Sequence, residues 1–103
     1  MYVADTWNGR IQHFALSGEW KSTAVELYGP RGVVSAPDGR VWVTDTGNHR
    51  LVVYDRELAS KEVIGKKGDN PLEFSTPVGI AADAAGAIYV ADTGNRRIQI
   101  LGS

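Results

Sequence analysis

Three stretches of the chain share one pattern: YVADTWNGRI at residues 2–11, WVTDTGNHRL at residues 42–51 and YVADTGNRRI at residues 89–98. Their aspartates, Asp5, Asp45 and Asp92, lie 40 and then 47 residues apart. A period of this length is typical of repeat proteins in which each repeat is one supersecondary unit. The chain is therefore built from repeats.

A second block of sequence supports the same period. PRGVV at residues 30–34, followed by PDG, matches PVGIA at residues 77–81, followed by DAAG. These two copies are again 47 residues apart, and the first repeat has no counterpart. The repeats are thus not all complete.

The composition of each repeat predicts β-structure. Residues 41–43 and 88–90 are runs of branched and aromatic residues bounded by Asp, Gly and Asn, as in strands that end at turns. We expect four strands per repeat: strand a after Pro-x-Gly, strand b ending at Asp-Thr, strand c after the arginine, and an outer strand d around residues 25–28 and 62–64. Asp38-Gly39 and Thr-Gly-Asn are expected to form the hairpin turns, because Gly and Asn tolerate positive φ.

This assignment divides the chain into three parts. Residues 1–28 are expected to form strands b-c-d, residues 29–74 strands a-b-c-d, and residues 75–103 strands a-b-c. The fold class predicted is all-β, with four-stranded antiparallel sheets as the repeating unit.

The motifs resemble NHL repeats. The resemblance rests on Asp-Thr-Gly-Asn-x-Arg after Tyr-Val-Ala, and on the linker from Ile64-Gly65-Lys66-Lys67-Gly68 to FSTPVGIA at residues 74–81. It covers nearly the whole chain. The departures are Trp7 and Gly9 in the first turn, and a linker before Pro30 that is seven residues shorter than the one before Pro77.

The resemblance implies blades of a closed β-propeller, most often of six blades, in which each sheet packs both faces against neighbours. Ten strands are too few for a ring, so open faces and edges are expected to drive self-association, most readily to a dimer or trimer. The two partial repeats both contain strands b and c. If two copies join by exchanging strands, one of the two b-c strand pairs has to be displaced. Alternatively, the chain is a truncated fragment that ends in an incomplete repeat, and the sequence leaves both possibilities open.

Composition bounds the partners. The 103 residues are 43% hydrophobic and 22% charged, with a net charge of -1, which fits a soluble domain and argues against nucleic acid as a partner. There is no cysteine, which excludes disulfides and thiolate metal sites.

Met1 runs straight into Tyr2-Val3-Ala4, so we expect no signal peptide and no membrane anchor in this chain. A start inside a motif suggests a piece of a longer protein.

The residues that recur in every turn are interpreted as architecture. An aspartate at the end of strand b can accept backbone N–H groups of the turn or pair with an arginine. A ring of metal-binding carboxylates is the less favoured reading, because a structural turn recurs in every repeat and a metal site need not. The set is Asp5, Asn8, Arg10, Asp45, Asn48, Arg50, Asp92, Asn95 and Arg97.

The positions that vary between the turns are Trp7, Gly9, His49 and Arg96, and Arg31 lies in a linker on the same expected rim. The candidate ligand or partner rim is Trp7, Arg31, His49 and Arg96. In propellers the b-c and d-a loops share one face, and loops held by a rigid scaffold often carry function. Basic side chains suit phosphates or an acidic partner, and Trp7 could stack on a base or sugar. A solvated rim with one exposed tryptophan is an equally good interpretation.

No motif indicates an enzyme. The chain lacks a Gly-x-Ser-x-Gly turn, a His-Glu-x-x-His pair and a phosphate loop. His13 occupies the position of Val53 and Ile100, which suggests a packing role. We therefore expect no catalytic residues, no metal, no cofactor, and a self-assembling scaffold that also accepts a protein or peptide. The alternatives are an RNA-binding face formed by His49, Arg50, Arg96 and Arg97, another ligand-binding face, or part of a lyase-like or lactonase-like propeller.

Overall fold

The computed structural model describes residues 1–102, and its regular structure is β apart from three one-turn 3-10 helices. The first sheet contains β1 (Tyr2–Asp5), β2 (Arg10–Phe14) and β3 (Trp20–Ala24). The second contains β4 (Gly32–Ser35), β5 (Val41–Asp45), β6 (Arg50–Tyr54) and β7 (Lys61–Ile64). The third contains β8 (Pro77–Ala82), β9 (Ile88–Asp92) and β10 (Arg97–Leu101). The predicted all-β, antiparallel class is confirmed.

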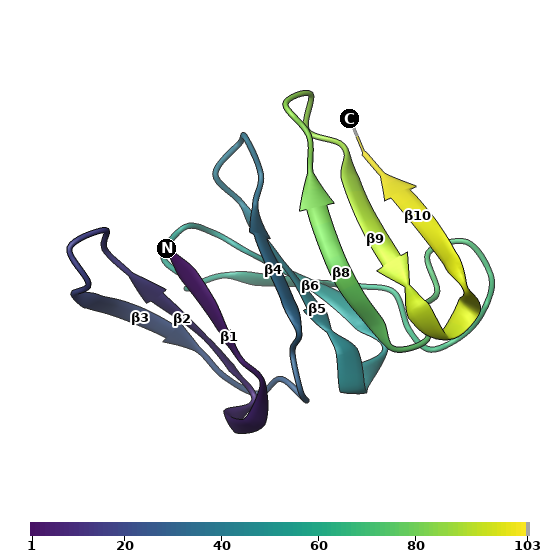
Figure 1. The fold of residues 1–103 in the computed structure, drawn as a ribbon, viewed down its shortest axis with the longest axis horizontal. Helices are drawn as coiled ribbons and strands as arrows, with labels where there is room; N and C mark the ends of the chain where they lie inside the picture. The colour runs from purple at the N-terminus through teal and green to yellow at the C-terminus, as the bar shows by residue number, and fades with distance from the viewer. Residues whose placement is uncertain (103) are drawn as a thin grey trace.

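The three sheets stand side by side in chain order, as Figure 1 shows. Strand β4 contacts β1 of the first sheet and β8 of the third, and these three strands form one side of the array. Within each sheet the strands follow the order of the sequence, so β3, β7 and β10 are at the opposite edges. The result is a row of stacked sheets with a free face at each end.

Two apolar layers hold the row together. Between the first and second sheets, Ile11 packs with Val43, Val52 and Tyr54, and Tyr2 and Ala4 add to this layer. Between the second and third sheets the layer contains Trp42, Leu51, Val53, Phe74, Ile88 and Val90. The alternation of side chains along each strand explains this division, because successive residues point to opposite faces.

Strand d of the first repeat is not where the sequence predicts it. The structure places it at Trp20–Ala24, whereas residues 25–28 form the linker to the next sheet. Glu26 has a φ of 65°, which no strand residue adopts, and Tyr28 N–H donates to Asp45 Oδ1 at 2.8 Å. The linker is thus bound to the second sheet through Tyr28, while the Leu27 N–H donates to Gly9 O at 3.1 Å, just before β2, and does not extend the first sheet. The other outer strand, predicted at residues 62–64, is confirmed as β7.

The turns between strands b and c also differ from the prediction. Thr6–Asn8, Thr46–Asn48 and Thr93–Asn95 form 3-10 turns, η1 to η3, and the positive φ falls on the next residue: Gly9, His49 and Arg96. Glycine is required at position 47 because there is no room for a side chain, and not because of a positive φ. A Cβ on Gly47 would lie 2.5 Å from Tyr28 O, because the linker crosses directly over this turn.

Candidate functional site

The same polar cluster closes each of the three turns. Asp5 accepts from Asn8 Nδ2 at 3.1 Å and from Arg10 Nε at 2.7 Å. The corresponding distances are 2.9 and 2.7 Å around Asp45, and 3.0 and 2.9 Å around Asp92. In each case the arginine is the residue directly opposite the aspartate in the sheet. The recurrent Asp, Asn and Arg residues therefore bind one another across strands b and c.

Two of the aspartates also bind the preceding linker. Asp45 Oδ1 accepts the Tyr28 N–H at 2.8 Å, and Asp92 Oδ1 accepts the Ser75 N–H at 2.7 Å. Both aspartates are fully buried, whereas the Asp5 side chain is partly exposed. Each buried carboxylate thus joins its own turn to the linker that arrives from the sheet before it.

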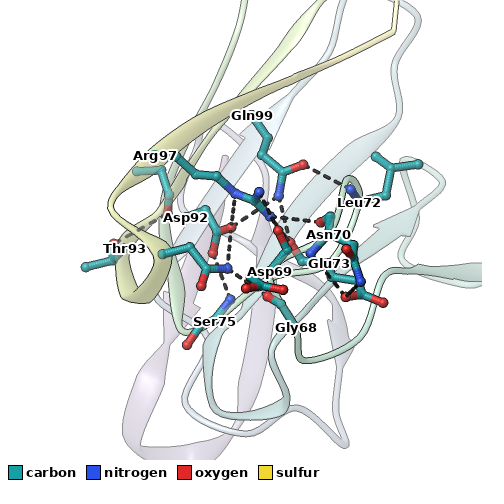
Figure 2. Close-up of polar contacts among 12 residues, drawn as sticks. Gly68, Asp69, Asn70, Leu72, Glu73, Ser75, Asp92, Thr93, Arg97 and Gln99 are labelled. Carbon is teal, nitrogen blue, oxygen red and sulfur yellow. Dashed lines mark hydrogen bonds and ion pairs between the residues drawn. The ribbon is translucent and has the colours of Figure 1, made fainter.

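The last sheet holds its linker with several hydrogen bonds, which Figure 2 shows. Arg97 Nη1 donates to Asp69 O at 2.8 Å, and its Nη2 donates to Asn70 O and Glu73 O, each at 2.9 Å. Gln99 Nε2 donates to Glu73 O at 2.7 Å. The longer linker before Pro77 is therefore wrapped around the edge of the third sheet.

Gln99 was missed by the sequence analysis. A signal for it exists, because Gln12 occupies the same position in the first repeat, while Val52 replaces it in the second. Burial opposes ionisation of Asp92. The Ser75 N–H, Asn95, Arg97 and Gln99 outweigh that effect and hold the pKa of Asp92 below its ordinary value.

These bonds use the turn carboxylates and two of the turn arginines, groups that the sequence also offers for other roles. Within residues 1–102, His, Asp and Glu side chains nowhere gather in threes in an arrangement that could hold a metal ion. Two members of the predicted RNA-binding face, Arg50 and Arg97, are paired with buried aspartates. Among the described residues, too, no helix has the length and apolar character needed to cross a membrane.

The structure brings two of the four predicted rim residues together. Trp7 and Arg31 line one cleft of about 470 Å³ between the first and second turns, together with Tyr28 and Gly47. Trp7 is 96% exposed, and Arg31 and Tyr28 are exposed as well. Tyr28 was assigned to a strand by sequence and was not recognised as part of the rim.

The other two rim residues lie elsewhere. His49 and Arg96 end the second and third turns in the left-handed conformation. His49 Nδ1 accepts the Thr76 N–H at 2.9 Å and so bridges to the next linker. Arg96 is exposed, and neither residue lines the cleft beside Trp7.

The two end sheets each leave one face uncovered. We define the N-terminal face as Val3, Gln12 and Phe14, which alternate with the packed residues of the first sheet and line a hollow of about 380 Å³. We define the C-terminal face as Tyr89, Ala91, Ile98 and Ile100, which alternate with the packed residues Ile88, Val90 and Leu101.

Both uncovered faces have buried counterparts in the second sheet. In repeat positions, the N-terminal face corresponds to Val43, Val52 and Tyr54, which are buried against the first sheet. The C-terminal face corresponds to Trp42, Thr44, Leu51 and Val53, on the side of the second sheet that packs against the third. Ile98 and Ile100 are 63% and 64% exposed, whereas Leu51 and Val53 are 0% and 3% exposed.

Comparison with known proteins is consistent with this architecture. The family model described as NHL repeat matches residues 27–54 and 74–101. No curated protein matches the chain. A solved structure of catalytically inactive virginiamycin B lyase from Staphylococcus aureus with quinupristin is similar, with a TM-score of 0.78 and 17% identity over 99% of this chain. An auxiliary nutrient binding protein from Bacteroides thetaiotaomicron has a TM-score of 0.70 and 16% identity over 98% of this chain.

The chain spans 34% of the length of each of these two structures. At such low identity the likeness concerns the fold alone. It shows that the row of sheets has the arrangement found within larger proteins.

Proposed function

Since the chain belongs to the NHL-repeat family, whose sheets are blades of β-propellers, we propose that it is a non-catalytic scaffold that assembles with itself into a closed ring. The observation that carries the proposal is the correspondence between its two uncovered faces and its own internal junctions. When the C-terminal face of one copy packs on the N-terminal face of another, the repeat positions that come together are the same as those that pack at the two internal junctions of each chain.

The energetics favour a closed arrangement over a single contact. Burying one large aliphatic side chain stabilises by about 1.5–3 kcal/mol. Association costs on the order of 4–15 kcal/mol in lost rotation and translation. Val3, Tyr89, Ile98 and Ile100 are the large exposed apolar side chains of one such junction. Two junctions formed together roughly double the buried area for one association, so a ring is more stable than an open chain of copies.

Two copies form the smallest ring that fits the family. One chain supplies three sheets, and rings of NHL repeats most often have six blades. Two chains joined face to face at both ends supply six sheets. This arrangement needs no exchange of strands, so the overlap of strands b and c in the partial repeats displaces nothing.

The absence of catalysis in this proposal is supported by how the polar residues are used. The aspartates and arginines of the turns bind one another, and two of the aspartates and Arg97 also bind linker backbone. Groups held in this way position the sheets, and the same cluster recurs at all three turns. A scaffold role also leaves the rim between the turns available for a protein or peptide partner.

The test is the mass in solution, measured by light scattering on a size-exclusion column from low to high micromolar protein. We expect a species of twice the 11.1 kDa of one chain, whose share rises with concentration. A folded monomer across the whole range would refute self-assembly. A discrete trimer would keep assembly but refute the six-sheet ring.

A further inference from the structure

The chain contains its own control for the cleft beside Trp7, because the junction between the second and third sheets is built from the equivalent positions. At that second junction, His49 reaches across and accepts the Thr76 N–H. At the first junction the equivalent residues are Gly9 and Gly29. Neither has a side chain, so no side chain takes the place of His49 in this cleft. The first turn and its linker are joined instead by the Leu27 N–H, which donates to Gly9 O at 3.1 Å, and by Thr6 Oγ1, which donates to Pro30 O at 2.7 Å.

Two further differences between the junctions place aromatic side chains at the edges of the cleft. Tyr28 stands in the place of Ser75, and its ring lies directly against the backbone of Gly47. Trp7 stands in the place of Gly47 and is almost wholly exposed. The cleft therefore has two aromatic side chains at positions where the next junction has a serine and a glycine.

The cleft also contains a positively charged side chain, Arg31. Arg31 replaces Val78 and is exposed at the same cleft. In the part of the chain that the structure describes, its guanidinium has no carboxylate within ion-pair distance. The arginine that begins strand c in each repeat, Arg10, Arg50 or Arg97, does have such a partner. An unpaired guanidinium beside aromatic rings is suited to an anion, because its planar fork matches a carboxylate or phosphate.

We propose that this cleft binds a small planar aromatic molecule that carries a negative charge. The rings of Trp7 and Tyr28 supply stacking surfaces, and Arg31 supplies the charge for a carboxylate or phosphate group. The cleft volume of about 470 Å³ is that of a small-molecule site. All of its lining residues belong to one copy, so the cleft is complete in a single chain.

The experiment is a titration of ¹⁵N-labelled protein with indole-3-acetate, followed by two-dimensional NMR. We expect saturable shifts of the Gly9, Gly29 and Gly47 amides, with a Kd below about 1 mM, and no shift of Gly94 at the second junction. Tryptamine, which has the same ring and the opposite charge, should bind at least about fivefold more weakly. Acetate alone should give no saturable shift.

Three variants each remove one of the proposed binding groups, and two of them, Tyr28→Ser and Trp7→Gly, introduce the residue of the second junction. Arg31→Gln and Tyr28→Ser should each weaken indole-3-acetate binding about two- to tenfold, as expected for one lost interaction. Trp7→Gly should do the same. Lys21→Gln, which removes an exposed cation on β3, is the control and should leave the affinity unchanged.

Three results would overturn the proposal: no saturable shift in the wild-type protein, shifts centred on Tyr89 and Ile98 rather than on the cleft, or equal binding by Arg31→Gln and by the wild type. Amide spectra of the strands report whether each variant is folded. The mass of the wild-type protein, measured separately, decides the assembly proposal, and either result there leaves this one standing.

Discussion

Asp92 and Asp5 occupy the same position in their repeats but have different surroundings. Asp92 is fully buried and accepts bonds from the linker, its turn, Arg97 and Gln99. Asp5 accepts only from Asn8 and Arg10 and is partly exposed. A buried carboxylate that satisfies several donors contributes more to stability than an exposed pair does.

We therefore predict that Asp92→Asn lowers the free energy of unfolding by about 2 kcal/mol or more, because it removes the charge that Arg97 and the Ser75 N–H bind. Asp5→Asn should cause a clearly smaller loss. Urea denaturation of both variants at one protein concentration measures this. Equal losses would mean that the bonds to the linker contribute nothing.

The lowered pKa of Asp92 also predicts an acid limit. A carboxylate whose pKa is lower in the folded state adds stability above its unfolded pKa of about 3.9, and this is lost as the pH falls through the folded value. The midpoint of thermal unfolding should therefore fall as the pH is lowered below about 4. The midpoint should fall less steeply with pH in Asp92→Asn than in the wild type. An identical dependence on pH in the two proteins would contradict the lowered pKa of Asp92.

Tyr54 provides a prediction of the opposite sign. Within residues 1–102, its hydroxyl is the buried side-chain group that has no hydrogen-bond partner, and burial, followed by the nearby Asp45, raises its pKa to about 12. Tyr54→Phe removes an unsatisfied group and should be neutral or stabilise by up to about 1 kcal/mol. Tyr2→Phe loses a bond from the hydroxyl to Arg56 O at 2.8 Å and should destabilise. Thermal unfolding of the pair decides the sign.

At the scale of elements, a turn and the linker above it act as one unit. The linker passes over Gly47 so closely that a methyl group there would lie 2.5 Å from Tyr28 O and 2.8 Å from its ring. Gly94 is covered in the same way by Ser75. At Trp7 no linker lies above the turn within this chain, which explains how a tryptophan fits a position that otherwise requires glycine.

Gly47→Ala should therefore destabilise by about 1–3 kcal/mol through overpacking. Trp7→Ala at the equivalent position should leave the free energy of unfolding nearly unchanged. Chemical denaturation of both variants is the measurement. A tolerated Gly47→Ala would mean that the linker can move away from the turn.

At the scale of the whole molecule, the unusual feature is that both ends of the row are unfinished in complementary ways. The exposed residues at the two ends correspond to the two faces of the second sheet, which are buried against the first sheet and the third. A repeat protein stacks each unit on its neighbours. The ends of this row present the faces that stacking would cover.

Ile98→Lys and Val3→Lys, from opposite ends, should each convert the proposed dimer to a monomer, because a lysine ammonium would be buried at the junction. Val25→Lys adds the same charge at an exposed linker position and is the control. Light scattering should show the mass halved in the first two variants and unchanged in the third. Retention of the dimer by both face variants would place the interface elsewhere.

Much of the fold can be predicted from the sequence because the same motifs recur in each repeat. Alternation and turn residues define strands b and c in all three repeats, and the recurrent Asp and Arg residues predict cross-strand contacts that the structure contains. Strand d of the first repeat was misplaced by a few residues. Its apolar residues Val25 and Leu27 resemble a strand in sequence, whereas Tyr28, which follows them, is bound by Asp45 in the turn of the next repeat.

The sequence by itself determined the repeat, its β class and the residues that close each turn, because those contacts are local. Only the tertiary structure decided that Tyr28 joins Trp7 and Arg31 at one cleft while His49 closes another. It also identified which apolar side chains are left uncovered at each end. These properties depend on how whole sheets stack and where the linkers cross, and therefore on contacts between residues far apart in the chain.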